Sequence, residues 1–160
     1  MLLTIGYKDI LNDLLGIIIS LPNDPAEGRR GGFFTTFEKE RSATTLPIGH
    51  FPEEKRSRYF RNSIEKSFRI YERKEVRSFL SRILENNQFG GGIYLNAVVC
   101  SFSGLPEKLD EVISLIYNIE TTISGGMSLE YITEIQTISF SDNEYIIPVA
   151  KQYLAMKRKN

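Results

Sequence analysis

The stretch IYLNAVVCSFSGLPEKLDEVISLI, residues 93–116, carries the strongest fold signal in the sequence. Its β-prone beginning, IYLNAVVCSFS, predicts two short strands that turn at Asn96 and Ala97, or one continuous buried strand. After Ser103 and Gly104, apolar residues recur at the spacing of a helix with one buried face. These residues are Leu105, Leu109, Val112, Ile113 and Ile116. The stretch therefore predicts strands that lead through a tight turn into a helix.

The residues before this stretch predict a helix, a hairpin and a second, longer helix. Leu11, Leu14, Leu15 and Ile18 fall at helical spacing and predict a first helix with one buried face. Residues 33–37 and 44–48 are β-prone and flank the charged residues 38–41, which predicts a hairpin. From Pro52 onward an apolar stripe predicts a long helix that buries this stripe. The stripe is Phe60, Ile64, Phe68 and Tyr71, with Lys55, Arg58, Lys66, Arg69 and Arg73 roughly opposite.

The remaining segments complete the predicted order of elements. Residues 75–84 predict a further helix or a bent continuation, with Val76, Phe79, Leu80 and Ile83 turned inward. Residues 131–140 are β-prone, and residues 146–160 predict a short helix with a basic tail. We therefore expect an α+β fold in which helices pack against an antiparallel sheet, with residues 1–160 forming a single domain. Residues 121–160 either complete the same sheet or form a C-terminal extension or docking arm.

Composition excludes several classes of site. Lysine plus arginine and aspartate plus glutamate number 20 each, so no overall field attracts nucleic acid or an anionic membrane. One cysteine, Cys100, and one histidine exclude an internal disulfide and the usual structural zinc sites. The apolar stretch of residues 14–21 is too short to span a bilayer, and the residues around it do not form an export signal. We expect a cytoplasmic protein with no membrane partner.

The segment SFSGLP, residues 101–106, is the first candidate binding site. It leads to a helix N-terminus, where free N–H groups and the helix dipole favour an anion or an oxygen-rich ligand. Ser101 or Ser103 could add a hydroxyl, and Gly104 allows close backbone approach. In the structural alternative, Ser103 caps the helix and Gly104 shapes the turn. Gly90, Gly91 and Gly92 could line the same corner, or they form a flexible junction between helix and strand.

The histidine and the cysteine are the other candidate reactive groups. His50 could serve a Ser-His-Asp mechanism with Asp110 or Glu111, or bind haem or a metal; the structural alternative is a partly exposed residue at a strand end. Cys100 lies among Val98, Val99 and Phe102, which favours an inert core thiol over a nucleophile.

A basic helix supports a different function. Residues 53–77 carry nine lysines and arginines against five glutamates, a local net charge of +4. Such concentration of charge is typical of nucleic-acid-binding proteins, and Arg58, Arg69 and Arg73 would make the contacts. The alternative is that these charges solvate the outer face of a helix whose other face is buried.

The segment FGGGIYLNAVVCSFSGLPEKLDEVISL, residues 89–115, resembles the C-terminal half of the GlcG/HbpS-like family, which is labelled haem-degrading. The matching features are Gly90-Gly91, Ser103-Gly104 and Asp110-Glu111. The resemblance implies a profilin-like layered architecture, oligomers, and binding of haem or small metabolites. No haem ligand is matched residue by residue.

We therefore expect a small-ligand-binding or sensor-like module of GlcG/HbpS type that forms homo-oligomers. Its predicted ligand-binding residues are Gly90, Gly91, Gly92, Ser101, Ser103, Gly104 and His50. No catalytic or metal-binding residue is assigned, and haem is the one cofactor considered. The alternatives are a nucleic-acid-binding protein that uses residues 53–77, a structural or interaction protein without a ligand, and a hydrolase built around His50.

Overall fold

A four-stranded antiparallel sheet forms the centre of the computed structural model, which describes residues 5–39 and 42–160. Its strands are β1 (Arg30–Glu38), β2 (Thr44–His50), β3 (Gly92–Leu95) and β4 (Val98–Ser103), in the order β2-β1-β4-β3. Asn96 and Ala97 connect β3 to β4 with φ angles of 53° and 61°, as a two-residue hairpin turn requires. This confirms the prediction of two strands and of the β1–β2 hairpin.

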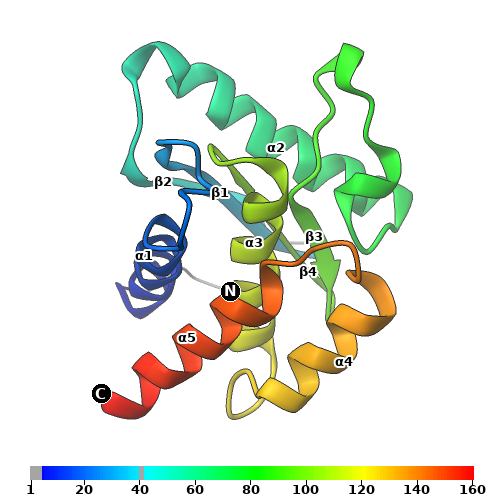
Figure 1. Ribbon diagram of the computed structural model, residues 1–160. Coiled ribbons are helices and arrows are strands. Elements are labelled where there is room, and N and C mark those ends of the chain that lie inside the picture. Colours follow the sequence, from blue (N-terminus) through cyan, green and yellow to red (C-terminus); the bar gives the residue numbers. More distant parts are fainter. Residues whose placement is uncertain (1–4, 40–41) are drawn as a thin grey trace.

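Residues 5–39 and 42–160 form five α-helices around the sheet. They are α1 (Ile5–Ile19), α2 (Arg56–Arg73), α3 (Glu107–Thr122), α4 (Leu129–Ser139) and α5 (Ile146–Lys159). Figure 1 shows α2 along one side of the sheet and α1, α3 and α5 on the other. The α+β class with helices packed on an antiparallel sheet is confirmed. Among the helices of residues 5–39 and 42–160, none is long and apolar enough to cross a membrane.

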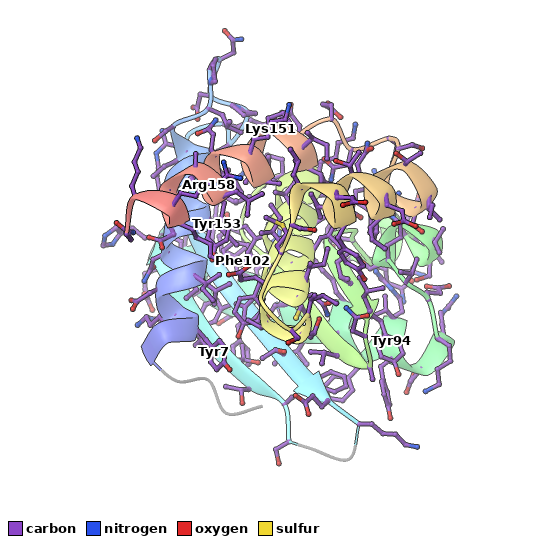
Figure 2. All side chains as sticks on the ribbon, turned by 90° about the horizontal axis from the view of Figure 1, so that it is seen from below. Tyr7, Tyr94, Phe102, Lys151, Tyr153 and Arg158 are labelled. Carbon is purple, nitrogen blue, oxygen red and sulfur yellow. The ribbon has the colours of Figure 1, made fainter. Side chains whose placement is uncertain are left out.

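The main core lies between the sheet and the helices α1, α3 and α5. Because side chains of a strand alternate between faces, Val98, Cys100 and Phe102 of β4 point into this core, together with Phe34 of β1. Figure 2 views this side: Phe102 lies inside the molecule, whereas Lys151 and Arg158 lie on the outside of α5. The predicted inward residues of the first helix are all buried here: Leu11, Leu14, Leu15 and Ile18.

The opposite face of the sheet packs against α2 through hydroxyl groups. Ser101 Oγ donates to the Ser63 carbonyl at 2.5 Å and shares a hydrogen bond of 2.6 Å with Ser67 Oγ. Thr35 Oγ1 and Ser63 Oγ share another at 2.9 Å. The buried hydroxyls of Ser101 and Thr35 therefore have partners on the helix, as buried polar groups require.

This packing corrects the predicted apolar stripe of α2. Phe60 and Phe68 are 41% and 46% exposed, whereas Ser63, Lys66 and Ser67 are buried. The helix turns small polar residues inward where the strand face presents hydroxyls. Its Ile70 packs with Val99 and Phe37 on the same face. Phe60 and Phe68 instead contact Phe33 and Phe37 at ring distances of 5.4 and 5.2 Å.

The predicted helix over residues 75–84 is wrong. Lys74 adopts a left-handed conformation with φ 57° and ends α2. The next residues pair with the sheet, since Tyr94 N donates to the Val76 carbonyl at 2.9 Å and Arg77 forms a bridge to Ile93. Only two short 3-10 turns follow, Ser78–Ser81 and Leu84–Asn86, and Leu80 is 65% exposed.

The prediction of a β-prone segment over residues 131–140 is also wrong. Ser128 caps helix α4 by accepting a hydrogen bond from Tyr131 N at 3.2 Å, and Ile132 is buried. The capping serine fixes the start of the helix in spite of the β-branched residues that follow. The predicted short helix over residues 146–160 is confirmed as α5.

Arg77 joins three parts of the chain. Its guanidinium donates to the buried carboxylate of Glu111 on α3 at 2.9 and 2.7 Å, and to Asp142 between α4 and α5 at 2.6 Å. The rings of Phe79 and Phe140 lie 4.9 and 5.0 Å from the guanidinium carbon. The segment after α2, helix α3 and the α4–α5 connection therefore meet at one side chain.

The end of β4 lies against β1 with no space for a side chain at Gly104. A Cβ atom added there would lie 2.2 Å from the Gly31 carbonyl oxygen and 2.6 Å from Gly32 Cα. We expect Gly104→Ala to lower the free energy of unfolding by about 1–3 kcal/mol, because the two backbones must separate. Urea unfolding followed by circular dichroism measures this loss.

Gly16→Ala is the matched control for this substitution. Gly16 is exposed in α1 and has open space around its Cβ position, so alanine should raise the free energy of unfolding by about 0.5–1 kcal/mol. Equal effects of the two substitutions would contradict the close approach at Gly104.

Candidate ligand-binding pocket

A pocket of about 320 Å³ opens where α2, the β4–α3 turn and the segment of residues 82–89 meet, and we call it the α2–α3 pocket. Figure 1 shows this last segment, in green, rising beside the N-terminal end of α3. The residues around the pocket come from these three parts of the chain and, with Glu27 and Arg29, from the connection before β1. They include Arg58, Tyr59, Asn62 and Lys66 from α2, residues 103–106 from the turn, and Arg82, Leu84 and Phe89 from the third segment.

Ser103 contributes a free hydroxyl to the α2–α3 pocket. The residue is only 4% exposed, and no described residue forms a hydrogen bond with its Oγ. Ser103 does not cap α3, because the N-cap position belongs to Pro106 and has no side-chain cap. Asp110 Oδ1 instead accepts from Leu105 N at 2.9 Å. The predicted capping role is therefore wrong, and the Ser103 hydroxyl faces the pocket without a protein partner.

A buried ion pair forms one wall of the α2–α3 pocket. Lys66 Nζ lies 3.0 Å from Asp110 Oδ2 and donates to the Phe102 carbonyl at 2.5 Å. The two side chains are 1% and 3% exposed. Burial raises the pKa of Asp110 to about 7, while Lys66 and the Leu105 N–H act in the opposite direction. The carboxyl group therefore keeps its proton to a higher pH than an ordinary aspartate.

Gly91 gives this ion pair its space. Gly91 has a φ of 103°, and a Cβ atom there would lie 2.5 Å from Asp110 Cβ and 3.0 Å from Lys66 Nζ. Lys66 comes from the helix on one face of the sheet and Asp110 from a helix on the other, so they meet only where β3 has not yet begun. The glycine run leaves that gap in the sheet.

The other predicted glycine and serine positions do not line the α2–α3 pocket. Gly90 N donates to Glu107 Oε1 at 2.7 Å, and Gly92 N donates to Ser78 Oγ at 2.8 Å. Ser101 is fully buried in the hydroxyl contacts with α2. Of the residues predicted to bind a ligand, the structure brings Ser103 and Gly104 together at the pocket. A binding role for the others stays a prediction.

His50 lies in a neighbouring pocket of about 580 Å³, which we call the His50 pocket. It is exposed at the end of β2, and its pocket shares Glu27, Arg29 and Tyr59 with the α2–α3 pocket. Both acids considered as its partners are bound elsewhere, since Asp110 pairs with Lys66 and Glu111 with Arg77. Neither acid lines the His50 pocket, so these residues do not form a Ser-His-Asp arrangement.

Two of the basic residues of α2 are not at the surface. Lys66 is paired with Asp110, and Arg69 donates to Glu65 at 2.9 Å and to the Ser78 carbonyl at 3.3 Å. Arg58 and Arg73 remain exposed. The surface of α2 therefore carries less positive charge than the sequence count suggests.

Cys100 is a core thiol, as its neighbours predict. The residue is fully buried, and burial raises the pKa of its thiol to about 12. The thiolate needed for nucleophilic chemistry is therefore unavailable at neutral pH.

Sequence reasoning missed Asn62, Tyr59 and Lys66 as pocket residues. The available signal was the polar series Ser63, Lys66, Ser67 at spacings of three and one along α2, which places a lysine among small buried hydroxyls. Arg82 and Leu84 carried no such signal, because their position depends on the bridge between Arg77 and β3.

No family model, curated protein or solved structure matches this chain. The resemblance to the GlcG/HbpS-like family rests on the residues quoted for it and stays a prediction.

The raised pKa of Asp110 generates a prediction for stability. The folded protein holds this proton more tightly than the unfolded chain, whose aspartate has its ordinary value of 3.8. The contribution of Asp110 to stability is therefore complete below the ordinary pKa and is lost as the pH rises toward 7. We expect the difference in unfolding free energy between wild type and Asp110→Asn to shrink from about pH 5 to about pH 7.

Urea unfolding of both proteins across this range measures the difference. Asp142→Asn is the control: hydrogen bonding to Arg77 lowers the pKa of that exposed carboxyl below its ordinary 3.8, so its contribution to stability should stay constant over this pH range. A difference for Asp110→Asn that grows with pH would mean that the ion pair outweighs burial.

Proposed function

We propose that this chain is a small-ligand-binding or sensor-like module and that the α2–α3 pocket is its binding site. The observation that carries the proposal is the Ser103 hydroxyl, which is 4% exposed and without a hydrogen bond to any described residue. Ser103 lines the pocket, so its hydroxyl is available to a ligand that binds there.

The lining of the α2–α3 pocket supports the same proposal. Tyr59, Leu84 and Phe89 offer apolar surface, and Arg58 and Asn62 offer polar groups. Pockets that hold small molecules combine these two kinds of surface and have volumes of roughly 300–1,000 Å³. A volume of about 320 Å³ favours a ligand of metabolite size.

The residues of the α2–α3 pocket do not fit haem. Haem iron takes its axial ligand from histidine, cysteine, methionine or tyrosine. Of these types, the pocket lining contains Tyr59 alone, which is 7% exposed, while His50 lies in the neighbouring pocket. From the resemblance to the GlcG/HbpS-like family, our proposal keeps a small metabolite as the ligand. It does not include haem.

An interaction role is the second candidate, favoured by a groove on α4. Leu129, Thr133 and Ile138 line this groove, and Ile138 is 71% exposed. A homo-oligomer that covers this surface fits the resemblance. Nucleic-acid binding has less support, because Arg69 and Lys66 are buried.

Native mass spectrometry of the purified protein, followed by an amide chemical-shift screen of small metabolites, tests the proposal. We expect bound small molecules whose shifts map to Asn62 and to residues 103–107. Asn62→Trp places a large side chain in the pocket and should weaken binding at least about tenfold. A steric clash with the ligand costs more than the roughly 1.4 kcal/mol that a tenfold change represents. His50→Ala, in the neighbouring pocket, is the control and should leave the affinity unchanged.

The other outcomes separate the alternatives. Shifts that map to the His50 pocket, or binding that survives Asn62→Trp with the fold intact, would refute the site. An oligomer that binds no small molecule would favour the interaction role. Salt-sensitive binding of oligonucleotides that is weakened by charge reversal at Arg58 and Arg73 would favour nucleic acid.

A further inference from the structure

We propose that the α2–α3 pocket recognises an oxyanion of its ligand, a phosphate or a carboxylate, through the Ser103 hydroxyl, the Arg58 guanidinium and the first backbone N–H groups of α3. The inference rests on the proposed function and adds the chemical class of the ligand. Four features of the pocket carry it: a free hydroxyl, an uncapped helix N-terminus, one unpaired cation and an apolar wall.

The Ser103 hydroxyl is the first feature. Its neighbour on the same strand face is Ser101, whose hydroxyl forms hydrogen bonds with Ser63 and Ser67 of α2. Ser103 lies two residues further along β4, where α2 no longer supplies a partner among the described residues. A hydroxyl donates one hydrogen bond and accepts two, so an oxyanion oxygen at this point would receive the Ser103 proton.

The second feature is the N-terminus of α3. This helix has sixteen residues, and its first turn follows Ser103 and Gly104 directly. No described side chain caps it, because Asp110 is committed to Leu105 N and to Lys66. The first N–H groups of a helix and its dipole attract negative charge. Glu107 and Asp110 in the first turn offset part of this positive end, so the helix end adds to the preference set by Ser103 and Arg58 and does not act alone.

The third feature is the charge balance of the pocket. Three of its cations have carboxylate partners: Lys66 with Asp110 at 3.0 Å, Arg82 with Glu107 at 3.3 Å and Arg29 with Glu27 at 3.5 Å. Arg58 has no ion-pair partner among the described residues. The pocket therefore has one uncompensated positive charge, on an exposed side chain.

The fourth feature is an apolar wall, which indicates that the ligand has an apolar part besides its charged group. Tyr59, Leu84 and Phe89 line the same pocket, and Leu84 remains 48% exposed. An apolar part of a ligand would cover this surface and remove it from water. We therefore expect an oxyanion joined to an apolar or planar group to bind more tightly than inorganic phosphate.

Titration of the protein with phenyl phosphate, benzoate, inorganic phosphate and the uncharged benzyl alcohol tests this inference. Amide chemical shifts report each affinity at about physiological salt, where distant charges are screened. We expect phenyl phosphate or benzoate to bind at residues 103–107 and benzyl alcohol to bind at least about tenfold more weakly, since a charge-assisted hydrogen bond contributes that much.

Three variants locate the contact. Arg58→Gln and Ser103→Ala should each weaken the charged probes about tenfold, as expected for loss of a hydrogen bond to a charged group. Arg61→Gln is the matched control: Arg61 is exposed on the same helix three residues further on and does not line the pocket. The Arg61→Gln variant should bind the charged probes with the affinity of the wild type.

Each outcome supports or overturns the inference. Equal weakening by Arg58→Gln and Arg61→Gln would show diffuse attraction rather than a site and would overturn it. Ligands that bind the pocket but are neutral, and insensitive to Arg58→Gln, would overturn it while leaving the proposed function in place. Charged probes that bind elsewhere, with no small molecule in the α2–α3 pocket, would overturn both. A preference of phenyl phosphate over benzoate, or the reverse, identifies the oxyanion.

Discussion

Two opposite charges from the two faces of the sheet, on Lys66 and Asp110, meet inside the protein, and the surrounding structure is arranged to allow it. An unpaired charge at such a depth would cost several kcal/mol, so each side chain depends on the other and on its remaining hydrogen bonds. The Phe102 carbonyl and the Leu105 N–H provide those bonds. Gly91 keeps the space between the helices free of a side chain. The need to pair Lys66 with Asp110 therefore constrains three features: where β3 starts, the turn after β4, and how closely α2 packs on the sheet.

The same requirement makes the pocket. Because β3 begins only at Gly92, the end of β4 has no neighbour on that side beyond Ser101. Ser103 and Gly104 are left at an open corner between α2 and α3, and the segment that precedes the glycines forms the outer wall. The inner face of α2 is polar for the same reason. Lys66 reaches Asp110 from this face, and the small residues Ser63 and Ser67 lie beside it. The buried pair and the free Ser103 hydroxyl are two results of one interruption in the sheet.

Local patterns predicted the parts of the fold that depend on simple periodicity. The spacing of Leu109, Val112 and Ile116 placed α3, and the β-prone runs placed both hairpins. The orientation of α2 was not predictable from its phenylalanines, because it depends on hydroxyls of strands distant in the sequence. Of the site, Ser103 and Gly104 were predictable because they sit at a turn. Asn62 and Arg82 reach the pocket only through tertiary contacts, which no local pattern encodes.

Arg77 gives the molecule a further property. One guanidinium holds Glu111 of α3 and Asp142 of the C-terminal helices, and it starts the segment that becomes the outer wall of the pocket. The anchoring of the C-terminal helices and the start of the pocket wall therefore depend on the same side chain, although Arg82 and Gly90 also bind the wall to Glu107 of α3.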